Sequence, residues 1–278
     1  MSIEIQAEQK ELKLLQWFGD FDSALIAYSG GVDSTYVLYA AQCVFGDKAL
    51  AVSSFSETVP QIQKDYALEN VRILSASYEI IQTEEMQKDE FVRNHPDRCF
   101  HCKDELYGVL GKMAQERKYA VVVDGTNADD ASDYRPGRKA AHLHGVRSPL
   151  LEIGMTKEEI RIRSRLAGLS TWNIPASACL SSRIPHQSVI TLEKLKTVET
   201  GESFLRSLGF VQIRVRHHDK IVRIELAPEE MKRVWQEDLF SRIVTHFKSL
   251  GFQFVTLDLE GYRSGSLNPT QVKSEDGR

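Results

Sequence analysis

Two serines, two glycines and an aspartate stand close together in the stretch Ser29-Gly30-Gly31-Val32-Asp33-Ser34. The apolar run 24–28 before it has strand character, and the apolar residues after it recur at helical spacing as far as Gly46. We therefore predict a strand, a tight loop and a helix N-terminus. Gly30 and Gly31 would let backbone N–H groups approach a ligand, while the serines add hydroxyl groups at the positive end of the helix. This arrangement favours phosphate, and a side chain at Gly31 is expected to fill phosphate space and to force a forbidden φ.

Three of the four cysteines are candidates for metal or sulfur chemistry. Cys99 and Cys102 form a C-x-x-C pair just before a predicted helix, which is compatible with zinc, an iron–sulfur cluster or redox chemistry. Cys179 lies in a loop of small residues that we expect near the same sheet edge. Three thiolates can hold three irons of a four-iron cluster and leave one iron open to sulfide, whereas His101 could complete a zinc site with them. Cys43 is expected to be a core residue of the helix after the loop.

Arginine alternates with apolar residues in two runs of the C-terminal part. The period of two places Arg214 and Arg216 on one face of the run 211–216, and the run 221–226 repeats the alternation. If the runs pair as a hairpin, Arg223 and Glu225 share this face. The pattern alone fits a solvated face as well as a site for an anionic ligand. We expect Glu225 to pair with Arg223, with metal binding as the alternative.

Strands alternate with helices over the first two thirds of the chain. Strands are predicted at 24–28, 49–52, 78–82 and 120–123, and helices at 8–18, 32–45, 61–74, 102–118 and 157–167. This order predicts an α/β fold with a doubly wound, mostly parallel sheet, in which ligands bind at the carboxyl ends of the strands. The loop 29–34, Ser53, Gly125 and Thr126 fall at such ends. We therefore expect a nucleotide crevice there.

The pattern changes after a loop over 172–185 that contains two prolines. A helix over 192–208, the two alternating runs, a helix over 229–250 and a strand over 252–259 predict a smaller α+β domain. The expected domains are therefore 1–184 and 185–278.

Composition limits the classes of partner. The 278 residues are 42% hydrophobic and 27% charged, with a net charge of −4. No apolar run approaches the ~20 residues that span a bilayer, and the N-terminus has no basic and apolar leader pattern, so we expect a cytoplasmic protein without membrane contact. The acidic total does not favour nucleic acid. Small molecules and copies of the chain itself are the expected partners.

Several motifs together carry a resemblance to a known family. Ser-Gly-Gly-Val-Asp-Ser resembles the pyrophosphate loop of the N-type ATP pyrophosphatases, and it lacks the lysine of the G-x-x-x-x-G-K-[ST] loop. Further motifs are Arg-Cys-Phe-His-Cys-Lys at 98–103, Asp-Gly-Thr-Asn at 124–127, Asp-Tyr-Arg-Pro-Gly at 133–137, Ala-Cys-Leu-Ser-Ser-Arg at 178–183, Arg-Val-Arg at 214–216 and Asp-Leu-Glu-Gly-Tyr-Arg-Ser-Gly at 258–265. Together they resemble the LarE family over nearly the whole chain.

This resemblance implies an ATP-dependent sulfurtransferase of nickel-pincer (lactate racemase) cofactor biosynthesis. A carboxylate of a pyridinium biscarboxylic acid mononucleotide would be adenylylated and replaced by a thiocarboxylate. The implied cofactors are ATP, Mg²⁺ and a [4Fe–4S] cluster, and homo-oligomers are expected. The implied nucleotide residues are Ser29, Gly30, Gly31, Asp33, Ser34, Ser53, Gly125 and Thr126, with Asp33 as a candidate to orient Mg²⁺. The implied substrate-phosphate residues are Arg214, Arg216 and Arg263.

The source of sulfur and the substrate leave alternatives open. Some members of the family sacrifice the sulfur of a single cysteine, whereas Cys99, Cys102 and Cys179 place this sequence with members that carry a cluster. A tRNA-thiolating ATP pyrophosphatase would share the loop and the C-x-x-C pair. An ATP-dependent amidating synthetase gives the three cysteines no role, and a non-enzymatic ATP-binding regulator would release no pyrophosphate.

Overall fold

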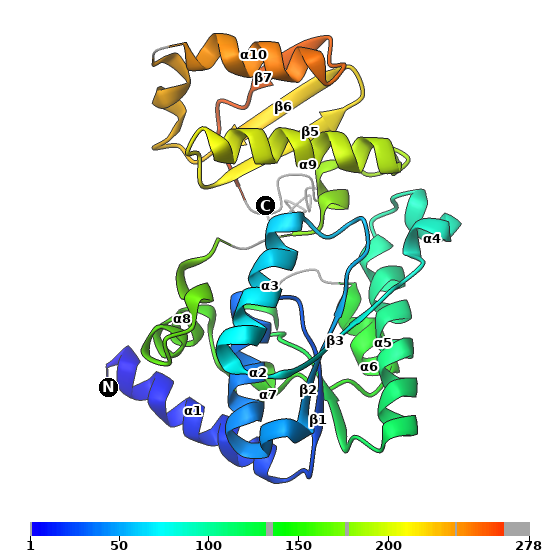
Figure 1. Cartoon of the computed structure of the whole chain (residues 1–278), viewed down its shortest axis with the longest axis vertical. Helices are drawn as coiled ribbons and strands as arrows, with labels where there is room; N and C mark the ends of the chain where they lie inside the picture. The colour runs from blue at the N-terminus through cyan, green and yellow to red at the C-terminus, as the bar shows by residue number, and fades with distance from the viewer. Residues whose placement is uncertain (1, 132–135, 176–177, 237, 264–278) are drawn as a thin grey trace, which may run out of the picture. The chain divides into compact units, whose positions relative to one another are not determined.

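The computed structural model describes residues 2–131, 136–175, 178–236 and 238–263 (Figure 1). Its contacts divide the chain into an N-terminal unit, Met1–Val92 with Asp97–Cys179, and a C-terminal unit, Arg93–Pro96 with Leu180–Arg278. The change of unit after Cys179 lies close to the predicted domain boundary after residue 184. Of the helices that the structure describes, none combines the length and the apolar character needed to cross a bilayer.

A parallel four-stranded sheet forms the centre of the N-terminal unit. Its strands are β1 (Ala24–Ala27), β2 (Ala49–Ser54), β3 (Ser77–Ile81) and β4 (Val121–Val123), in the order β3-β2-β1-β4. The strands are rich in Ala, Val, Leu and Ile, and β1 and β4 are buried along their whole length, as expected for parallel strands covered on both faces. The predicted α/β class is therefore confirmed.

Helices cover both faces of this sheet. They are α1 (Ile3–Gly19), α2 (Val32–Phe45), α3 (Gln61–Leu74), α4 (Asp89–Val92), α5 (Arg98–Arg117), α6 (Gly137–Leu143), α7 (Pro149–Glu152) and α8 (Lys157–Leu166). Ala24 and Ile26 of β1 pack in one core with α1, α2, α3 and α8, whereas Leu25 and Ala27 pack in a second core with α5 and α6. The strand period of two thus separates two hydrophobic layers.

Short 3₁₀ helices connect several of these elements. They are η1 (Gly46–Lys48), η2 (Glu85–Gln87), η3 (Ala128–Ala131) and η4 (Ser170–Asn173) in the N-terminal unit, and η5 (Leu180–Arg183) and η6 (Met231–Trp235) in the C-terminal unit. The predicted capping box opens α8: the Thr156 hydroxyl accepts from the Glu159 N–H, and the Glu159 carboxylate accepts from the Thr156 N–H.

The C-terminal unit is a small α+β structure, as predicted. It consists of α9 (Leu192–Ser207), β5 (Ile213–His218), β6 (Ile221–Leu226), α10 (Leu239–Ser249) and β7 (Phe254–Leu257), together with η5 and η6. The sheet order is β5-β6-β7, with β6 antiparallel to β5 and parallel to β7. Gly201 lets α9 approach α10 and β5, because a Cβ there would lie 2.5 Å from the ring of Phe247.

Three local predictions were wrong. The predicted helix over 229–250 is split into η6 and α10, because Gln236 adopts an extended backbone and α10 starts anew after Asp238. Helix α5 begins at Arg98, four residues before the predicted start at residue 102, so the C-x-x-C pair lies in its first turn. Cys43 is exposed and is not a core residue, because the buried part of α2 ends at Ala41.

Candidate nucleotide, thiol and anion sites

The phosphate-loop candidate lies at the switch point of the parallel sheet. Strand β1 pairs with β2 on one side and with β4 on the other, so the loops after β1 and β4 leave neighbouring strands at their carboxyl ends. These loops are 29–34 and 124–127, the two segments that the sequence marked as nucleotide-binding. Open α/β sheets bind ligands in the crevice at such a point.

Hydrogen bonds between the two serines hold the first loop in shape. The Oγ atoms of Ser29 and Ser34 are 3.0 Å apart, and the Ser34 Oγ also accepts from the Ser29 N–H at 3.2 Å. The Gly31 N–H donates to the Ser29 Oγ at 3.4 Å. The serine hydroxyls therefore brace the start of α2 in addition to being available as donors to an anion.

The two glycines of this loop have different roles. Gly30 has φ +74°, and a Cβ there would lie 2.6 Å from the Cβ of Ala67, so both its conformation and its packing require glycine. Gly31 has φ −78°, and a Cβ there would meet only the Ser29 Oγ, at 3.5 Å. The expectation that a side chain at Gly31 forces a forbidden φ is wrong; that constraint falls on Gly30.

The second loop packs directly on the first. A Cβ at Gly125 would lie 2.7 Å from the Ser34 nitrogen, so this glycine allows the β4 loop to touch the start of α2. The neighbouring Asp124 carboxylate accepts from the Thr126 N–H and hydroxyl, both at 3.0 Å, and from the hydroxyls of Tyr107 at 2.7 Å and Ser148 at 2.8 Å. Thr126 is thus fixed by Asp124.

Ser53 supports this region from the interior. It is 1% exposed and its hydroxyl donates to the Tyr28 carbonyl at 2.7 Å, at the point where β1 enters the loop. In the structure Ser53 therefore anchors the strand end beneath the loop.

Asp33, the candidate for orienting Mg²⁺, has two partners from distant parts of the chain. The ammonium group of Lys157, the first residue of α8, forms an ion pair with it, and the Asn127 side-chain amide donates to its Oδ1 at 3.3 Å. The Lys157 N–H in turn donates to Asp129 at 2.8 Å. Sequence reasoning missed Lys157, because the segment Thr156-Lys157-Glu158-Glu159 was interpreted only as a helix cap.

The three candidate cysteines act on one another electrostatically. Burial raises the pKa of the Cys99 and Cys102 thiols, the latter to about 12, and Cys179 raises both further. Glu85 is the strongest charged contributor at Cys102, whereas Lys103 partly offsets the increase. Because such effects require groups within several Å, the structure places Cys179 beside the first turn of α5. Deprotonating these thiols together requires a compensating positive charge.

The chemistry of this donor set fits a cluster better than a single ion. Over the ranges that the structure describes, no group of three His, Cys, Asp or Glu side chains is placed to hold one metal ion. His101 instead lies 3.6 Å from Asp97. A zinc ion needs its ligands around one point, whereas each iron of a [4Fe–4S] cluster takes a separate thiolate. Three thiols that surround a shared space meet the second requirement.

Glu85 is a further polar group next to these thiols. Its side chain is 3% exposed, and its Oε1 accepts from the Thr58 hydroxyl at 3.2 Å. Its Oε2 is buried without a hydrogen-bond partner among the described residues. Nothing in the local sequence distinguishes Glu85 from the exposed Glu84 beside it.

The predicted arginine face exists in the C-terminal unit. Arg214 pairs in register with Glu225, and Arg216 with Arg223, as expected for the hairpin. The Glu225 carboxylate accepts from Arg216 in a bidentate pair at 2.9 and 2.8 Å, and from Arg223 at 3.0 Å. The predicted pairing of Glu225 with Arg223 is confirmed, although Arg216 forms the larger share of the contact.

A second buried ion pair borders this face and was not predicted. Arg183 and Glu202 form a bidentate pair at 2.8 and 3.0 Å with both side chains 1% exposed, and Arg206 adds a contact at 3.0 Å. Burial raises the pKa of Glu202, but the nearby Arg183 more than offsets this, so the pKa lies below its usual value. Arg183 is the last residue of the motif 178–183, where attention fell on the cysteine.

Arg214 occupies the most electropositive position of this group. It donates to the Ile213 carbonyl at 2.7 Å and to the Tyr262 hydroxyl at 3.3 Å, and its guanidinium lies 4.8 Å from the centre of the Tyr262 ring. Burial, together with the nearby Arg183, lowers its pKa to about 10. Five arginines (183, 206, 214, 216 and 223) are linked here to three carboxylates (Glu202, Glu225 and Asp258). This excess of positive charge favours an anionic ligand.

Arg263 lies in a different environment from the other two predicted phosphate ligands. Its side chain is 51% exposed and pairs with Glu260 one turn earlier in the chain. The rest of its motif, residues 264 and 265, and the Asp-Tyr-Arg of the motif 133–137 lie outside the described residues.

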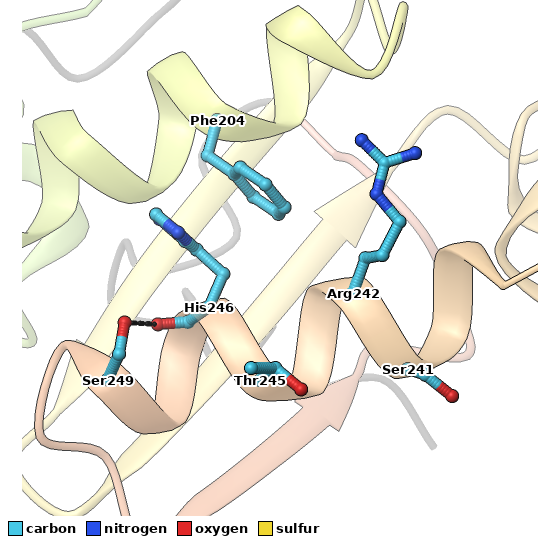
Figure 2. Close-up of a pocket in the computed structure, with 6 residues that line it drawn as sticks. All are labelled: Phe204, Ser241, Arg242, Thr245, His246 and Ser249. Atoms are coloured by element: carbon cyan, nitrogen blue, oxygen red, sulfur yellow. Dashed lines mark hydrogen bonds between the residues drawn. The ribbon is translucent and has the colours of Figure 1, made fainter.

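A shallow pocket in the C-terminal unit lies away from these charges. Phe204 of α9 and Arg242 and His246 of α10 line it, and Figure 2 shows the rings of Phe204 and His246 facing each other. Their centroids are 3.8 Å apart at 13°. The arginine face lies on β5 and β6, so the pocket between the helices is not the anion site.

Comparison with known proteins identifies relatives along nearly the whole chain. No protein-family profile matches it. It is 37% identical over 268 residues to the pyridinium-3,5-bisthiocarboxylic acid mononucleotide synthase of Lactiplantibacillus plantarum, covering 96% of each chain. It is 44% identical over 266 residues to an uncharacterised protein of Synechocystis, covering 96% of this chain and 99% of that one. An uncharacterised protein of Methanocaldococcus jannaschii is 32% identical over 247 residues, covering 86% of this chain and 90% of that one.

Proposed function

The chain belongs to the LarE family, that of pyridinium-3,5-bisthiocarboxylic acid mononucleotide synthase, and we propose that it is an ATP-dependent sulfurtransferase acting on a pyridinium mononucleotide. It adenylylates a carboxylate of the mononucleotide and replaces the activated oxygen by sulfur. The observation that best supports this is the presence, in one compact unit, of a phosphate loop at the sheet switch point and three neighbouring thiols.

The loop residues would hold and polarise ATP. A carboxylate is a poor acyl donor until its oxygen becomes part of a phosphate ester leaving group, so the enzyme must bring two anions together. Loop N–H groups and the hydroxyls of Ser29 and Ser34 offset phosphate charge at the start of α2. Lys157 supplies the ammonium charge that the loop motif itself lacks. Asp33 is the loop carboxylate that would hold Mg²⁺, which adds further positive charge at the triphosphate.

The thiol group and the nucleotide site are connected through a buried hydrogen bond. Tyr107 lies on α5, the helix that carries Cys99 and Cys102, and donates to Asp124 beside Thr126. A [4Fe–4S] cluster held by the three thiolates would leave one iron without a cysteine, so sulfide could be reloaded after each turnover. The protein groups provide the enclosure: Arg98 and Lys103 favour the anionic form of Cys99.

The arginine face of the C-terminal unit would bind the phosphate of the mononucleotide. Guanidinium groups donate paired hydrogen bonds to phosphate oxygens. Arg214 is the principal candidate, because the positive charge around it exceeds the negative charge. Arg216 is oriented by Glu225 and can present its remaining N–H groups.

One experiment separates a cluster-based enzyme from a protein that sacrifices a cysteine. Anaerobically reconstituted protein is expected to contain about four irons per chain and to make several thiolated products per chain when sulfide is supplied. Alanine at Cys99, Cys102 or Cys179 should abolish thiolation and leave pyrophosphate release intact. A mass loss of about 34 Da on Cys179 alone, with the other two variants active, would show a sacrificial donor instead.

The same material tests the remaining parts of the proposal. Pyrophosphate release that depends on tRNA and not on the mononucleotide would identify a tRNA thiolase. We also propose a cytoplasmic homo-oligomer, for which sedimentation of the purified chain should give a mass above that of one protomer.

A further inference from the structure

Glu85 combines deep burial with an unsatisfied carboxylate oxygen. The residue opens η2, which packs against α5 and α4. Its Oε1 is bonded to Thr58, whose hydroxyl lies 2.8 Å from the Ser56 Oγ in a buried polar group. Its Oε2 has no hydrogen-bond partner among the described residues.

Such an oxygen is costly unless something else binds it. A buried polar atom without a partner loses its hydration without compensation, and the penalty is larger for a charged group. Native structures contain few such atoms, and an ion or a functional ligand is a common explanation. The group nearest to Glu85 in electrostatic terms is the Cys102 thiol of the first turn of α5.

The donor set around this space is three thiols and one carboxylate. Cys99, Cys102 and Cys179 influence one another, and Glu85 joins them from η2. A carboxylate among thiolates is electrostatically unfavourable unless metal cations neutralise both. Carboxylate oxygen binds iron less tightly than thiolate sulfur and exchanges more readily, because it is the harder donor.

We propose that the Glu85 carboxylate is the fourth protein ligand of the cluster, bound through Oε2 to the iron that no cysteine holds, and that sulfide must displace it. This inference rests on the proposed function, because it presupposes the three-cysteine cluster. The exchange is a ligand substitution without redox change: the iron–oxygen bond breaks, HS⁻ donates its electron pair to the same iron, and the carboxylate leaves as an anion.

In the proposed resting state Glu85 protects the exchangeable iron from solvent. The Thr58 hydroxyl holds Oε1 and thereby points Oε2 away from the polar group at 56–58. When sulfide leaves with the product, the carboxylate returns to the same iron.

The wild-type protein permits a direct spectroscopic test. The cluster is reconstituted anaerobically in protein labelled with ¹³C at the carboxyl groups of glutamate and is then reduced. Electron–nuclear double resonance should detect one coupled ¹³C nucleus, which disappears when sodium sulfide is added. Absence of any ¹³C coupling in a four-iron protein that still makes thiolated product would overturn the role of Glu85 and leave the proposed function intact.

Variants provide the second measurement. Glu85→Gln keeps the shape and the acceptor for Thr58 but loses the anionic ligand, and the matched control Glu84→Gln removes the same charge from the exposed neighbour. Glu85→Gln should retain about four irons, lose the ¹³C coupling and reach half-saturation at about tenfold less sulfide. Glu84→Gln should match wild type in all three.

The remaining outcomes also decide the question. Equal sulfide affinities for wild type and Glu85→Gln would overturn the proposal, and so would a ¹³C coupling that survives in Glu85→Gln. If the wild-type chain takes up no iron, the cluster-based function fails, and the role of Glu85 fails with it. Thr58→Val, which removes the bond to Oε1 alone, should retain the coupling and thereby show that binding and support are separate roles.

Discussion

Lys157 forms an ion pair with Asp33 although the two residues lie 124 positions apart in the chain. Asp33 lies in the first turn of α2 and Lys157 is the first residue of α8, so two helix N-termini approach each other at the sheet switch point. Both side chains remain partly exposed, at 22% and 29%. The pair can therefore open toward a ligand, with Lys157 moving to a phosphate and Asp33 to a cation.

Lys157→Ala should weaken ATP binding and pyrophosphate release. Loss of one charge-assisted hydrogen bond is expected to cost about 1.5–3 kcal/mol in binding, or roughly tenfold to a hundredfold in affinity, with little change in the free energy of unfolding because the pair is partly exposed. ATP titration by calorimetry measures the effect, and Lys139→Ala, at an exposed position of the same unit, is the control. Equal ATP affinity in both variants would remove Lys157 from the nucleotide site.

Alanine at Gly30 and Gly31 should have opposite consequences. Gly30→Ala places a Cβ on Ala67 and keeps a positive φ, so it should destabilise the fold by about 1–3 kcal/mol or more. Gly31→Ala should leave the fold unchanged, because its φ is ordinary and the Cβ has space, but should weaken ATP binding if phosphate approaches its N–H. Thermal unfolding with and without ATP separates the two effects, and the same loss of stability in both variants would contradict the assignment of strain to Gly30.

Arg214→Ala and Arg263→Ala should differ in their effect on the mononucleotide. Arg214 is buried where positive charge is in excess, so its loss should weaken binding by about 1.5–3 kcal/mol. Arg263 is exposed and offset by Glu260, so its loss should cost less than about 1 kcal/mol. ATP affinity should not change in either variant. Calorimetric titration with the mononucleotide is the measurement, and a larger loss for Arg263→Ala would show that this arginine moves to the ligand.

Glu202→Gln should destabilise the C-terminal unit by about 3–5 kcal/mol at neutral pH, because it leaves the buried Arg183 without its carboxylate. The pKa of Glu202 is lower in the folded chain than in the unfolded chain, so its contribution is present above the unfolded value of about 4.5 and is lost as the pH falls. The difference in unfolding free energy between wild type and variant should therefore shrink below that pH. Denaturant titrations at several pH values measure it, with Glu260→Gln as the exposed control. A difference that is independent of pH would contradict the ionic role.

The local features of this protein could be predicted from its sequence. The phosphate loop needs its glycines and serines within six residues, so the motif marks the turn directly. The hydrophobic runs gave the α/β class, the capping box of α8 and the hairpin that carries Arg214, Arg216 and Glu225. In each case the pattern repeats with the period of one element, or lies within one turn, and needs no information about distant packing.

The partners that complete the sites were decided by tertiary structure. Lys157 reaches Asp33, Glu202 meets Arg183, and Glu85 approaches Cys102 because separate elements pack together, and a lysine or glutamate in a helix has the same local pattern whether it is exposed or buried. The errors have the same origin. Cys43 lies on the helical stripe of α2 but beyond the part that the sheet covers. The strain assigned to Gly31 belongs to Gly30, because the backbone path past Ala67 determines which glycine takes the positive φ.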